Sequence, residues 1–480
     1  MDTILVGAVV QLESRRGFLK SAGVGAAAAA GSYFVGNRAL GQESYRWANE
    51  QPVVAFIGTG IRFHTSLGRG ATEFGPCAAV CDVDIVQAGR ALQVVYDQHR
   101  KKGWPIATAV SQDYRAVLDR DDVDVVVIGS PDHWHTKQAI DAMRAGKDVY
   151  CEKPLTLTIR EGRQIEKVMA ETGKVVQVGT QQRTEFGQQF ATAAAMVRDG
   201  RCGKMERVTA AIGGCPSSDP LPVRPVPGNL NWDLWLGQAP FSEYRQGPLI
   251  DTTGWGAGHP HSRTHRYYRW WYEYSGGIVT DWGAHHVDIS FWALDLLSAD
   301  AGRMVIDPVE VHHPVPMKEG MPTRDDQFNT ATSFNVNFTL PGGIEFRLRN
   351  SAESDLGFRN GIMFEGSEGR FLVNRGKLVG RPVEDLASNP LPAGAIEKLY
   401  GGPIPPSHMG NFMECVKTRR QPISDVPSHN RAMAVCHVAN IAMRLGRKLT
   451  YDPQTESFVD DKQADGFLAR EQRKGYEIDA

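Results

Sequence analysis

The sequence lacks the cysteine patterns of a disulfide framework or a zinc centre. It contains 7 cysteines, an odd number, and no two of them stand in a CxxC arrangement. Both features argue against structural disulfides and against a structural zinc site. We therefore expect the cysteines to be mostly buried, reduced thiols.

An excess of either charge is also absent. The chain has 53 Lys and Arg against 55 Asp and Glu, which gives a formal net charge of -2. Without a basic excess, neither nucleic acid nor an anionic membrane is an expected partner. No long apolar run follows the N-terminal region, so no membrane span is expected there. A chain of 480 residues is too long for one ordinary core, and we expect two domains plus extensions.

The first 43 residues have the layout of an export signal. Residues 14–20 read SRRGFLK, close to the twin-arginine export consensus. An Ala- and Gly-rich apolar stretch over 22–36 follows, and Ala39-Leu40-Gly41 offers a small-x-small cleavage site. This order of parts predicts export in folded form to the periplasm. The alternative is an N-terminal helix that carries two arginines.

A nucleotide-binding turn follows the first apolar run. Residues 53–57 are typical of a buried parallel strand, and Gly58-Thr59-Gly60 comes directly after them. The glycines permit a tight turn and a close approach of backbone N–H groups to a pyrophosphate. Phe63 stands where the third glycine of the fingerprint is expected. We expect Gly58, Gly60, Ile61, Arg62 and Phe63 to contact the cofactor.

Further strands extend this region into a parallel sheet over residues 44–182. The run 78–81 ends at Asp82, which is placed to bind ribose hydroxyls and so favours NAD over NADP, although an acid there can also be turn chemistry. The run 123–128 stops at Gly129-Ser130-Pro131. Strands that alternate with helical stretches predict right-handed βαβ units.

Two polar segments follow strand ends, where open α/β sheets bind ligands. The first is PDHWH at 131–135, and the second is Glu152-Lys153-Pro154 after a strand at 148–151. Lys153 could hydrogen-bond a substrate hydroxyl, or it could be a solvated surface lysine. The residues expected to contact the cofactor here are Ser130, Pro131, His133, His135, Glu152 and Lys153.

These motifs together resemble the Gfo/Idh/MocA oxidoreductases, a family that includes inositol dehydrogenases and glucose–fructose oxidoreductase. The strand-GxG opening, PDHWH and above all CEKP at 151–154 carry the resemblance. VGTQQR at 178–183 is similar to the loop that ends the family's nucleotide domain, which makes Gln182 and Arg183 candidate substrate contacts. The resemblance spans about 53–451 and implies a Rossmann doubly wound parallel sheet followed by an α/β domain with an open, mainly antiparallel sheet.

The pattern after residue 182 agrees with such a second domain, over 183–425. A helix is expected at 187–200, and strands at 205–212, 305–313, 330–340, 344–349, 362–365 and 370–374. Helices at 409–417 and 430–445 follow. The segment 426–480 is expected to pack back on the nucleotide domain, with 457 onward either a mobile tail or an arm across a partner subunit.

A polar stripe follows Gly276-Gly277. On a helix, Asp281, His285 and Asp288 share one face at i, i+4 and i+7. A histidine beside a carboxylate is suited to remove a hydroxyl proton as hydride leaves the same carbon, although a lone helical histidine is more often structural. The family resemblance implies that Lys153 orients substrate, Asp281 binds a hydroxyl and His285 is the acid/base. His286 is a weaker candidate for substrate contact.

An aromatic block, RYYRWWY at 266–272, precedes this stripe. Its Arg269 and Trp271 could bind a sugar by hydrogen bonding and stacking, or the block could be core packing. The histidines nearby fit no standard metal-ligand spacing, so no metal is expected. They are His259, His261, His265, His312 and His313.

The sequence therefore predicts an NAD(P)-dependent oxidoreductase that oxidises a hydroxyl of a sugar, polyol or glycoside, in a homo-oligomer. NAD is favoured over NADP, and export implies a tightly held cofactor. Two alternatives stay open. One is a redox-neutral NAD-dependent glycosidase of the kind represented by exported α-N-acetylgalactosaminidases, and the other is a secreted carbohydrate-binding protein without catalysis.

Overall fold

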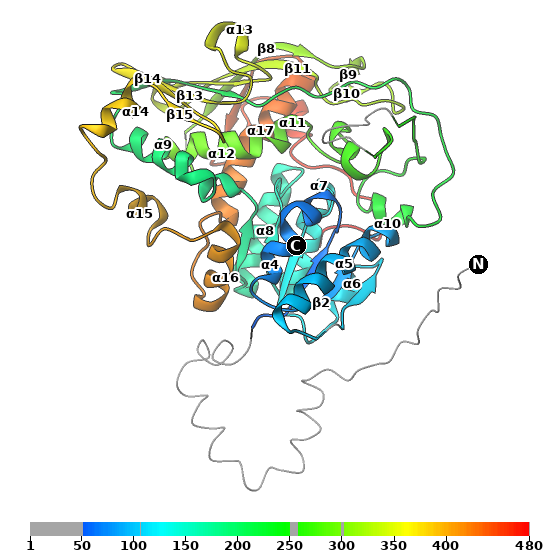
Figure 1. Cartoon of the computed structure of the whole chain (residues 1–480). Helices are drawn as coiled ribbons and strands as arrows, with labels where there is room; N and C mark the ends of the chain where they lie inside the picture. Colours follow the sequence, from blue (N-terminus) through cyan, green and yellow to red (C-terminus); the bar gives the residue numbers. More distant parts are fainter. Residues whose placement is uncertain (1–50, 106, 250–257, 299–301, 480) are drawn as a thin grey trace, which may run out of the picture.

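The computed structural model describes residues 51–105, 107–249, 258–298 and 302–479, and the export motif lies outside them. Two sheets organise these residues, one of six strands and one of nine (Figure 1). The cysteines, all within the described residues, are unpaired and buried. None of the helices in the described ranges is both long and apolar enough to cross a membrane.

The N-terminal sheet is parallel throughout, with strand order β3-β2-β1-β4-β5-β6. Its strands are β1 (Val54–Ile57), β2 (Cys77–Cys81), β3 (Ala109–Ser111), β4 (Val125–Ile128), β5 (Asp148–Cys151) and β6 (Val176–Val178). Its helices are α4 (Gly68–Thr72), α5 (Ile85–Lys102), α6 (Arg115–Leu118), α7 (Asp132–Arg144) and α8 (Ile159–Thr172). This is the doubly wound Rossmann arrangement, whose ligands lie at the carboxyl ends of the strands.

Local sequence explains these elements. The central strands are continuous apolar runs because helices cover both faces of the sheet, and every residue of β1, β4 and β5 is buried. Asp84 and Thr158 accept backbone N–H groups at the starts of α5 and α8. Gly103 and Gly173 end the same helices in the left-handed conformation, so the helix bounds follow from capping residues.

The second sheet has the order β15-β14-β13-β7-β12-β11-β8-β16-β17 and is antiparallel except for the pairing of β7 with β12. Its strands are β7 (Met205–Ala211), β8 (Met304–His312), β11 (Ser333–Thr339), β12 (Glu345–Arg349), β13 (Gly361–Gly366), β14 (Gly369–Val373), β15 (Leu378–Val379), β16 (Leu449–Asp452) and β17 (Ser457–Phe458). A separate hairpin joins β9 (Met317–Lys318) and β10 (Met321–Pro322). The expected α/β fold with a mainly antiparallel second sheet is confirmed.

Helices cover one face of this sheet and fill the space between the sheets (Figure 1). The long ones are α9 (Gln189–Arg198), α12 (Gly283–Ala293), α16 (His408–Thr418) and α17 (Val426–Leu445). The short ones are α10 (Trp232–Leu236), α11 (Ile278–Asp281), α13 (Glu353–Leu356), α14 (Arg381–Glu384), α15 (Ala395–Tyr400) and α18 (Lys462–Asp465). Helix α12 is buried on every side, and α17 packs on both α12 and α8, so α17 ties the two domains together.

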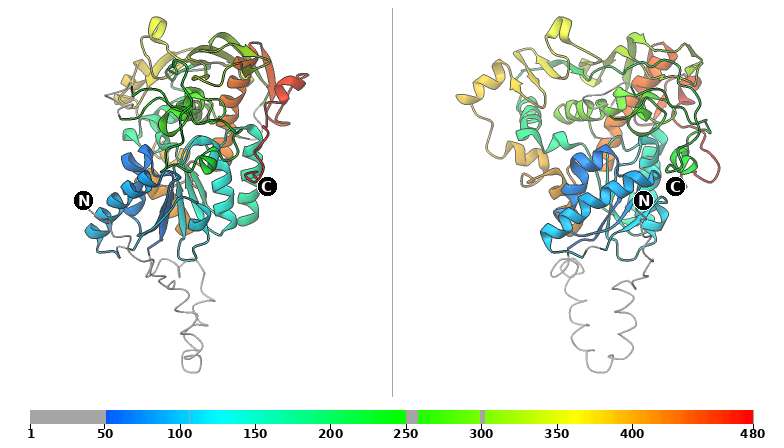
Figure 2. Two further views of the ribbon diagram at one scale, coloured as in Figure 1. Left: turned by 90° about the vertical axis from the view of Figure 1, so that its right-hand side faces the viewer. Right: turned by 45° about the vertical axis from the view of Figure 1, so that its right-hand side comes forward.

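The described part of the C-terminal segment packs on the chain itself, and an arm from 457 onward across a partner subunit stays a prediction. Strand β17 extends the large sheet, and Arg470 donates to the carbonyl of Glu273 at 2.7 Å. The last residues run beside α8 (Figure 2), where Gln164 donates to the carbonyl of Ile478 at 3.2 Å. These contacts are made one at a time to residues far along the chain, so no local pattern predicts which residues the segment touches.

Candidate functional site

A cavity of about 450 Å³ lies at the carboxyl ends of β1, β2 and β4. From the nucleotide domain it is lined by seven of the expected cofactor contacts, namely Gly58, Gly60, Ile61, Arg62, Asp82, Ser130 and Pro131. From the second domain it is lined by Leu230, Leu234, Trp235, His259, His265, Arg266, Tyr268 and Arg269. The long irregular segment between β7 and α11 therefore forms one wall of the cavity.

The two glycines of the GxG turn have different structural roles. Gly58 has a φ of +83°, and a Cβ there would lie 2.3 Å from the backbone nitrogen of Ser130. A Cβ at Gly60 would meet nothing within 4 Å, and Gly60 lines the cavity. Gly58 is thus required by the fold, whereas Gly60 leaves room for a ligand next to the backbone. This cradle fits a dinucleotide pyrophosphate.

Phe63 does not line the cavity. Its side chain is 1 % exposed and packs edge-on against Phe56, with ring centroids 4.9 Å apart. A Cβ on Gly68 would lie 2.7 Å from the Phe63 ring, so Gly68 makes room for the ring. The expected cofactor contact at Phe63 is therefore not made, because the ring fills the core beneath the turn.

Asp82 holds the same turn from the end of β2. One carboxylate oxygen accepts the Thr59 backbone N–H at 2.8 Å, and the other accepts the Asp84 N–H at 2.9 Å. Burial raises the pKa of Asp82, although these two N–H groups oppose that rise. Because Asp82 also lines the cavity, its oxygens lie where ribose hydroxyls would be bound.

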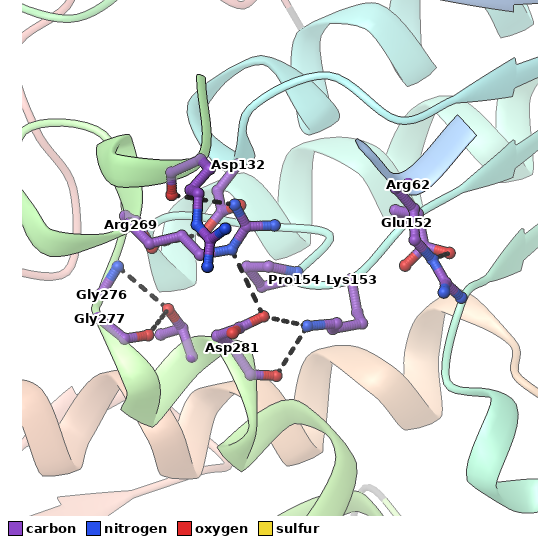
Figure 3. Close-up of polar contacts among 12 residues, drawn as sticks. Arg62, Asp132, Glu152, Lys153, Pro154, Arg269, Gly276, Gly277 and Asp281 are labelled. Carbon is purple, nitrogen blue, oxygen red and sulfur yellow. Dashed lines mark hydrogen bonds and ion pairs between the residues drawn. The ribbon is translucent and has the colours of Figure 1, made fainter. Parts of the chain in front are cut away.

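Lys153 lies at the end of β5 and points toward α11. Its Nζ forms an ion pair with the Asp281 carboxylate and donates to the Asp281 carbonyl at 3.0 Å. The Lys153–Pro154 peptide bond is cis. Figure 3 shows Asp281 between Lys153 and Arg269, whose Nε is 3.8 Å from the same carboxylate oxygen. Lys153 is 128 residues from Asp281 in the chain, so the fold creates this pair.

Three histidines hold the turn that carries Lys153. His135 contacts the carbonyls of Pro154 and Ser130 through its two ring nitrogens, at 2.6 and 2.8 Å. His429 of α17 accepts the backbone N–H of Leu155 at 3.3 Å. His437, two turns further along α17, contacts the Thr156 hydroxyl at 3.1 Å. His135 therefore fixes the turn and does not line the cavity.

Glu152, the neighbour of Lys153, fixes an arginine at the edge of the cavity. One of its oxygens accepts Arg62 Nε at 2.8 Å and Gln181 Nε2 at 2.9 Å. Burial opposes the charge of Arg62, yet Glu152, Tyr150 and Asp281 together outweigh burial and raise the pKa of Arg62. Arg62 is thereby held charged where a pyrophosphate would lie.

His285 lies one turn beyond Asp281, and only Trp282 separates α11 from α12. Its side chain is 4 % exposed, and Nδ1 is buried without a hydrogen-bond partner among the described residues. Burial lowers the pKa of His285 well below its ordinary value, and the charges of Lys153 and Arg375 lower it further. The imidazole is therefore neutral at pH 7, as a proton acceptor must be.

Asp281 is ionised beside it. Burial would raise the pKa of Asp281, but the charges of Lys153 and Arg269 outweigh burial and hold that pKa below its usual range. An ammonium, a carboxylate and a neutral imidazole are thus assembled at one place. This set can orient a hydroxyl and take up its proton.

Arg183 and Asp288 form a buried ion pair away from this set. Arg183 donates to the two oxygens of Asp288 at 2.8 and 2.6 Å and to the Ile423 carbonyl at 2.5 Å. Their side chains are 3 % and 0 % exposed. The expected contact between Arg183 and a substrate is therefore not available, because the Arg183 donors are used inside the protein.

Three other expected contacts also lie apart from the cavity. His133 contacts the Trp235 carbonyl at 2.9 Å, and Trp271 donates to the Ser262 carbonyl at 3.2 Å with the Arg263 guanidinium over its ring. His286 contacts Asn360 at 3.1 Å, and burial lowers its pKa to about 3. All three side chains are buried against protein groups, which lie far along the chain for His133 and His286 and within nine residues for Trp271.

The structure gives Gln182 a partner on each side and adds Arg375 and His265, which were not among the expected contacts. Gln182, an expected substrate contact, bridges the carbonyl of His285 and Nε of Arg375, each at 3.2 Å, in the amide orientation that satisfies both of its ends. Arg375 follows β14 and has no motif around it. His265, set aside as a metal ligand, pairs with Asp84 at 3.0 Å. Among the described residues, no group of three or more His, Cys, Asp or Glu side chains could hold a metal ion.

Two family models match the chain. The NAD-binding Rossmann fold of the Gfo/Idh/MocA oxidoreductases matches residues 53–180, and the C-terminal alpha/beta domain of the same family matches residues 389–478. The chain is 33 % identical over 159 residues to an alpha-N-acetylgalactosaminidase of Shewanella oneidensis, covering 33 % of this chain and 34 % of that protein. The chain thus matches about a third of the length of such relatives.

Solved structures share the fold over most of the chain. The WlbA dehydrogenase from Bordetella pertussis, in complex with NADH and UDP-GlcNAcA, has a TM-score of 0.54 and 15 % identity, covering 83 % of this chain and 98 % of that one. An aldose-aldose oxidoreductase from Caulobacter crescentus, complexed with glycerol, has a TM-score of 0.53 and 16 % identity, covering 83 % and 99 %. The chain therefore matches the family models of both the NAD-binding Rossmann domain and the C-terminal α/β domain of the Gfo/Idh/MocA oxidoreductases, and these solved structures share its fold.

Proposed function

We propose that this protein is an NAD-dependent oxidoreductase that oxidises a hydroxyl of a sugar, polyol or glycoside, as inositol dehydrogenases and glucose–fructose oxidoreductase do. One observation carries the proposal. Lys153, Asp281 and His285 come together from two domains, beside a cavity whose glycine turn suits a dinucleotide. Arg269 links this set of side chains to the cavity, because Arg269 lines the cavity and its Nε lies 3.8 Å from the Asp281 carboxylate.

Each side chain has a separate role in this reaction. NAD bound in the cavity supplies a hydride acceptor for the carbon that bears the hydroxyl. His285, neutral through burial, accepts the hydroxyl proton. The Lys153 ammonium donates a hydrogen bond to the reacting oxygen, and Asp281 accepts one from a second hydroxyl. The C–H and O–H bonds are lost together, and a carbonyl remains on the product.

We further propose NAD rather than NADP, and a cofactor that is held tightly. The Asp82 carboxylate at the cavity would repel a ribose phosphate. The wall formed by the second domain supports slow release, because Asn229 donates to Asp84 at 2.7 Å and the Ile85 N–H donates to the Asn229 carbonyl at 3.0 Å. A cofactor beneath this wall could leave only after such contacts open.

A redox-neutral NAD-dependent glycosidase is the second candidate. The relatives named as glycosyl hydrolase family 109 proteins and as an alpha-N-acetylgalactosaminidase favour it. In that reaction a ring hydroxyl is oxidised transiently, the glycosidic bond is eliminated, and the same hydride returns after water adds. Lys153, Asp281 and His285 would serve the oxidation step in both candidates. A carbohydrate-binding protein without catalysis would not need this set.

Analysis of the retained nucleotide separates the candidates. The purified mature protein is denatured, and any released nucleotide is identified by mass spectrometry. Retained NAD together with glycoside cleavage and no net NADH would refute the dehydrogenase and support the glycosidase. An empty protein that turns over added NAD would refute retention. An empty protein with neither NAD binding nor turnover would favour a binding protein.

Two variants test the site itself. Lys153→Ala and His285→Ala should each lower turnover about a hundredfold or more, because each removes a group that acts on the reacting hydroxyl. Lys167→Ala is a matched control, since Lys167 lies on α8 with its side chain 59 % exposed. Circular dichroism and thermal melts verify folding of each variant. Near-normal turnover in either site variant would refute the assignment.

Export and assembly are also proposed. The twin-arginine motif at 14–20 supports folded export to the periplasm, and a fusion to a reporter active only after export tests it, with Arg15→Lys/Arg16→Lys as the blocked control. We propose a homo-oligomer whose interface is the outer face of the large sheet, where the partly exposed side chains of β11 and β12 lie. Light scattering of the mature protein gives the subunit number; a monomer would refute the oligomer.

A further inference from the structure

Arg375 is a cation held beside the proposed active site by the second domain. Its guanidinium lies 4.4 Å from the ring centre of Trp282 and 4.7 Å from that of Phe186. Trp282 follows Asp281 directly, and Gln182 links Arg375 Nε to the carbonyl of His285. Two aromatic rings and an amide therefore fix the guanidinium next to the helix that carries the catalytic groups.

The nearby carboxylates do not pair with Arg375. Asp281 pairs with Lys153 and lies near Arg269, and Glu152 pairs with Arg62. Asp132, buried, accepts the hydroxyls of Tyr268 and Ser275 at 2.9 and 2.6 Å. Within the described residues, no carboxylate oxygen lies within the 4.0 Å that defines an ion pair with Arg375.

Among the described residues around the site, the cationic side chains therefore outnumber the carboxylates. The cations are Lys153, Arg62, Arg269 and Arg375, and the carboxylates are Asp281, Glu152 and Asp132. Burial lowers the pKa of Arg375, and the charge of Arg62 lowers it further, although Asp281 and Glu152 oppose this. A partly buried positive charge without an anion is costly, and an anionic ligand removes that cost.

The dinucleotide does not account for this charge. The cavity that would hold it is lined by Arg62, Arg90, Arg266 and Arg269, but not by Arg375. Arg375 instead lies on the side of Gln182 and His285, where the substrate would be bound. One of the five guanidinium N–H groups is used by Gln182, which leaves the terminal nitrogens to bind a carboxylate in the two-pronged manner typical of arginine.

We infer that Arg375 binds a carboxylate of the substrate, so that the substrate is a sugar acid and not a neutral sugar or polyol. This inference rests on the proposed function, because it places the substrate between Arg375 and the Lys153–Asp281–His285 set. Arg375 would select the substrate and would hold no proton or hydride of the reaction.

Matched pairs of sugars test the inference. The probes are the hexuronic acids and the neutral hexoses of the gluco, galacto and manno series, together with their methyl glycosides. Binding to the NAD-loaded protein is measured by calorimetry, and turnover is measured separately. We expect at least one acid to bind about tenfold to a hundredfold more tightly than its neutral partner, as a charge-assisted hydrogen bond implies.

Arg375→Gln should remove this preference, because the affinity for the acid should fall about tenfold to a hundredfold more than the affinity for its neutral partner. Arg375→Lys keeps the positive charge but loses the two-pronged guanidinium, so this variant should keep part of the preference for the acid. The control is Arg370→Gln, because Arg370 lies on β14 with its side chain 64 % exposed. This control should keep the wild-type preference.

Other outcomes would overturn the inference. Binding by none of the acids would do so, as would equal affinity for both members of every pair or an equal loss for both in Arg375→Gln. The proposed function fails separately. Acid binding that depends on Arg375, without hydride transfer, would keep the carboxylate site and refute the oxidoreductase. Oxidation of neutral sugars that is insensitive to Arg375→Gln would keep the oxidoreductase and refute the carboxylate site.

Discussion

Replacement of Arg183 by methionine should damage the fold, although the sequence places this residue in a loop expected to bind substrate. Methionine fills much of the same volume but cannot pair with Asp288, whose side chain is 0 % exposed. Burial raises the pKa of Asp288, and only the Arg183 charge and hydrogen bonds oppose that rise to an appreciable extent. The carboxylate would therefore be left buried without its cation.

The size of the loss can be worked out from this geometry. Removing one partner of a buried ion pair costs about 3–5 kcal/mol. For the roughly 420 residues that the structure describes, the unfolding entropy is about 0.9 kcal/mol per kelvin near the melting temperature. The quotient gives a decrease in Tm of about 4 °C for Arg183→Met. Removal of both charges in Arg183→Met/Asp288→Leu should recover more than half of that decrease.

The assay is a thermal melt of the NAD-loaded protein, followed by circular dichroism, together with turnover at a temperature well below the melt. The control is Arg359→Met, because Arg359 lies on the surface with its side chain 79 % exposed. A Tm of Arg183→Met within about 1 °C of wild type, combined with a large loss of turnover, would refute the structural assignment. Arg183 would then bind substrate after all.

Three further predictions follow from the turn and from the buried histidines. Gly60→Val should keep the Tm but abolish NAD binding measured by calorimetry, because the valine side chain would enter the cavity. Gly58→Ala should lower the Tm, because the φ of +83° at this position is unfavourable for alanine. The reverse pattern would contradict the roles assigned to the two glycines. Phe63→Gly, which restores the missing glycine, should cost about 3–5 kcal/mol in urea unfolding because it empties a core site; unchanged stability would contradict the packing of Phe63. Burial lowers the pKa of His133, His286 and His429 to about 3 and that of His408 and His437 to about 4. Below pH 6.5 these histidines bind protons in the unfolded chain but not in the native protein. Each histidine therefore lowers the free energy of unfolding by about 1.4 kcal/mol per pH unit from pH 6.5 down to about 4. A Tm that does not change between pH 7 and pH 4.5 would contradict this.

The fold followed from local patterns to a large extent. The continuous apolar runs before Gly58 and Gly129 became β1 and β4, and the expected strand at 148–151 has the bounds of β5. Glycine-bounded turns account for the pairing of β11 with β12 and of β13 with β14 in the second sheet. Such features depend on neighbouring residues, which a sequence displays directly. Strand β16, added from residues far from the rest of the sheet, had no comparable local pattern.

The site was predictable where one strand end or one helix face contains the residues. Lys153, Asp281 and His285 were expected together, and the first two form an ion pair. Arg183 and Trp271 were misplaced because a sequence does not show which charged or aromatic side chain has a buried partner. For Arg183 that partner is Asp288, 105 residues away. Arg375 carries no motif, and only folding brings it to Gln182.

Helix α17 has a consequence for how the protein is made. His429 and His437 of this helix hold the turn after Lys153, and Asn440 donates to the carbonyl of Gly276 at 2.9 Å, just before the helix that carries Asp281. Both halves of the site are thus supported by a helix that the ribosome adds after it has added either half. A nascent chain that has its nucleotide domain but not yet α17 lacks the contacts that hold Lys153 and Asp281 in place. The proposed site can therefore form only after α17 has been synthesised.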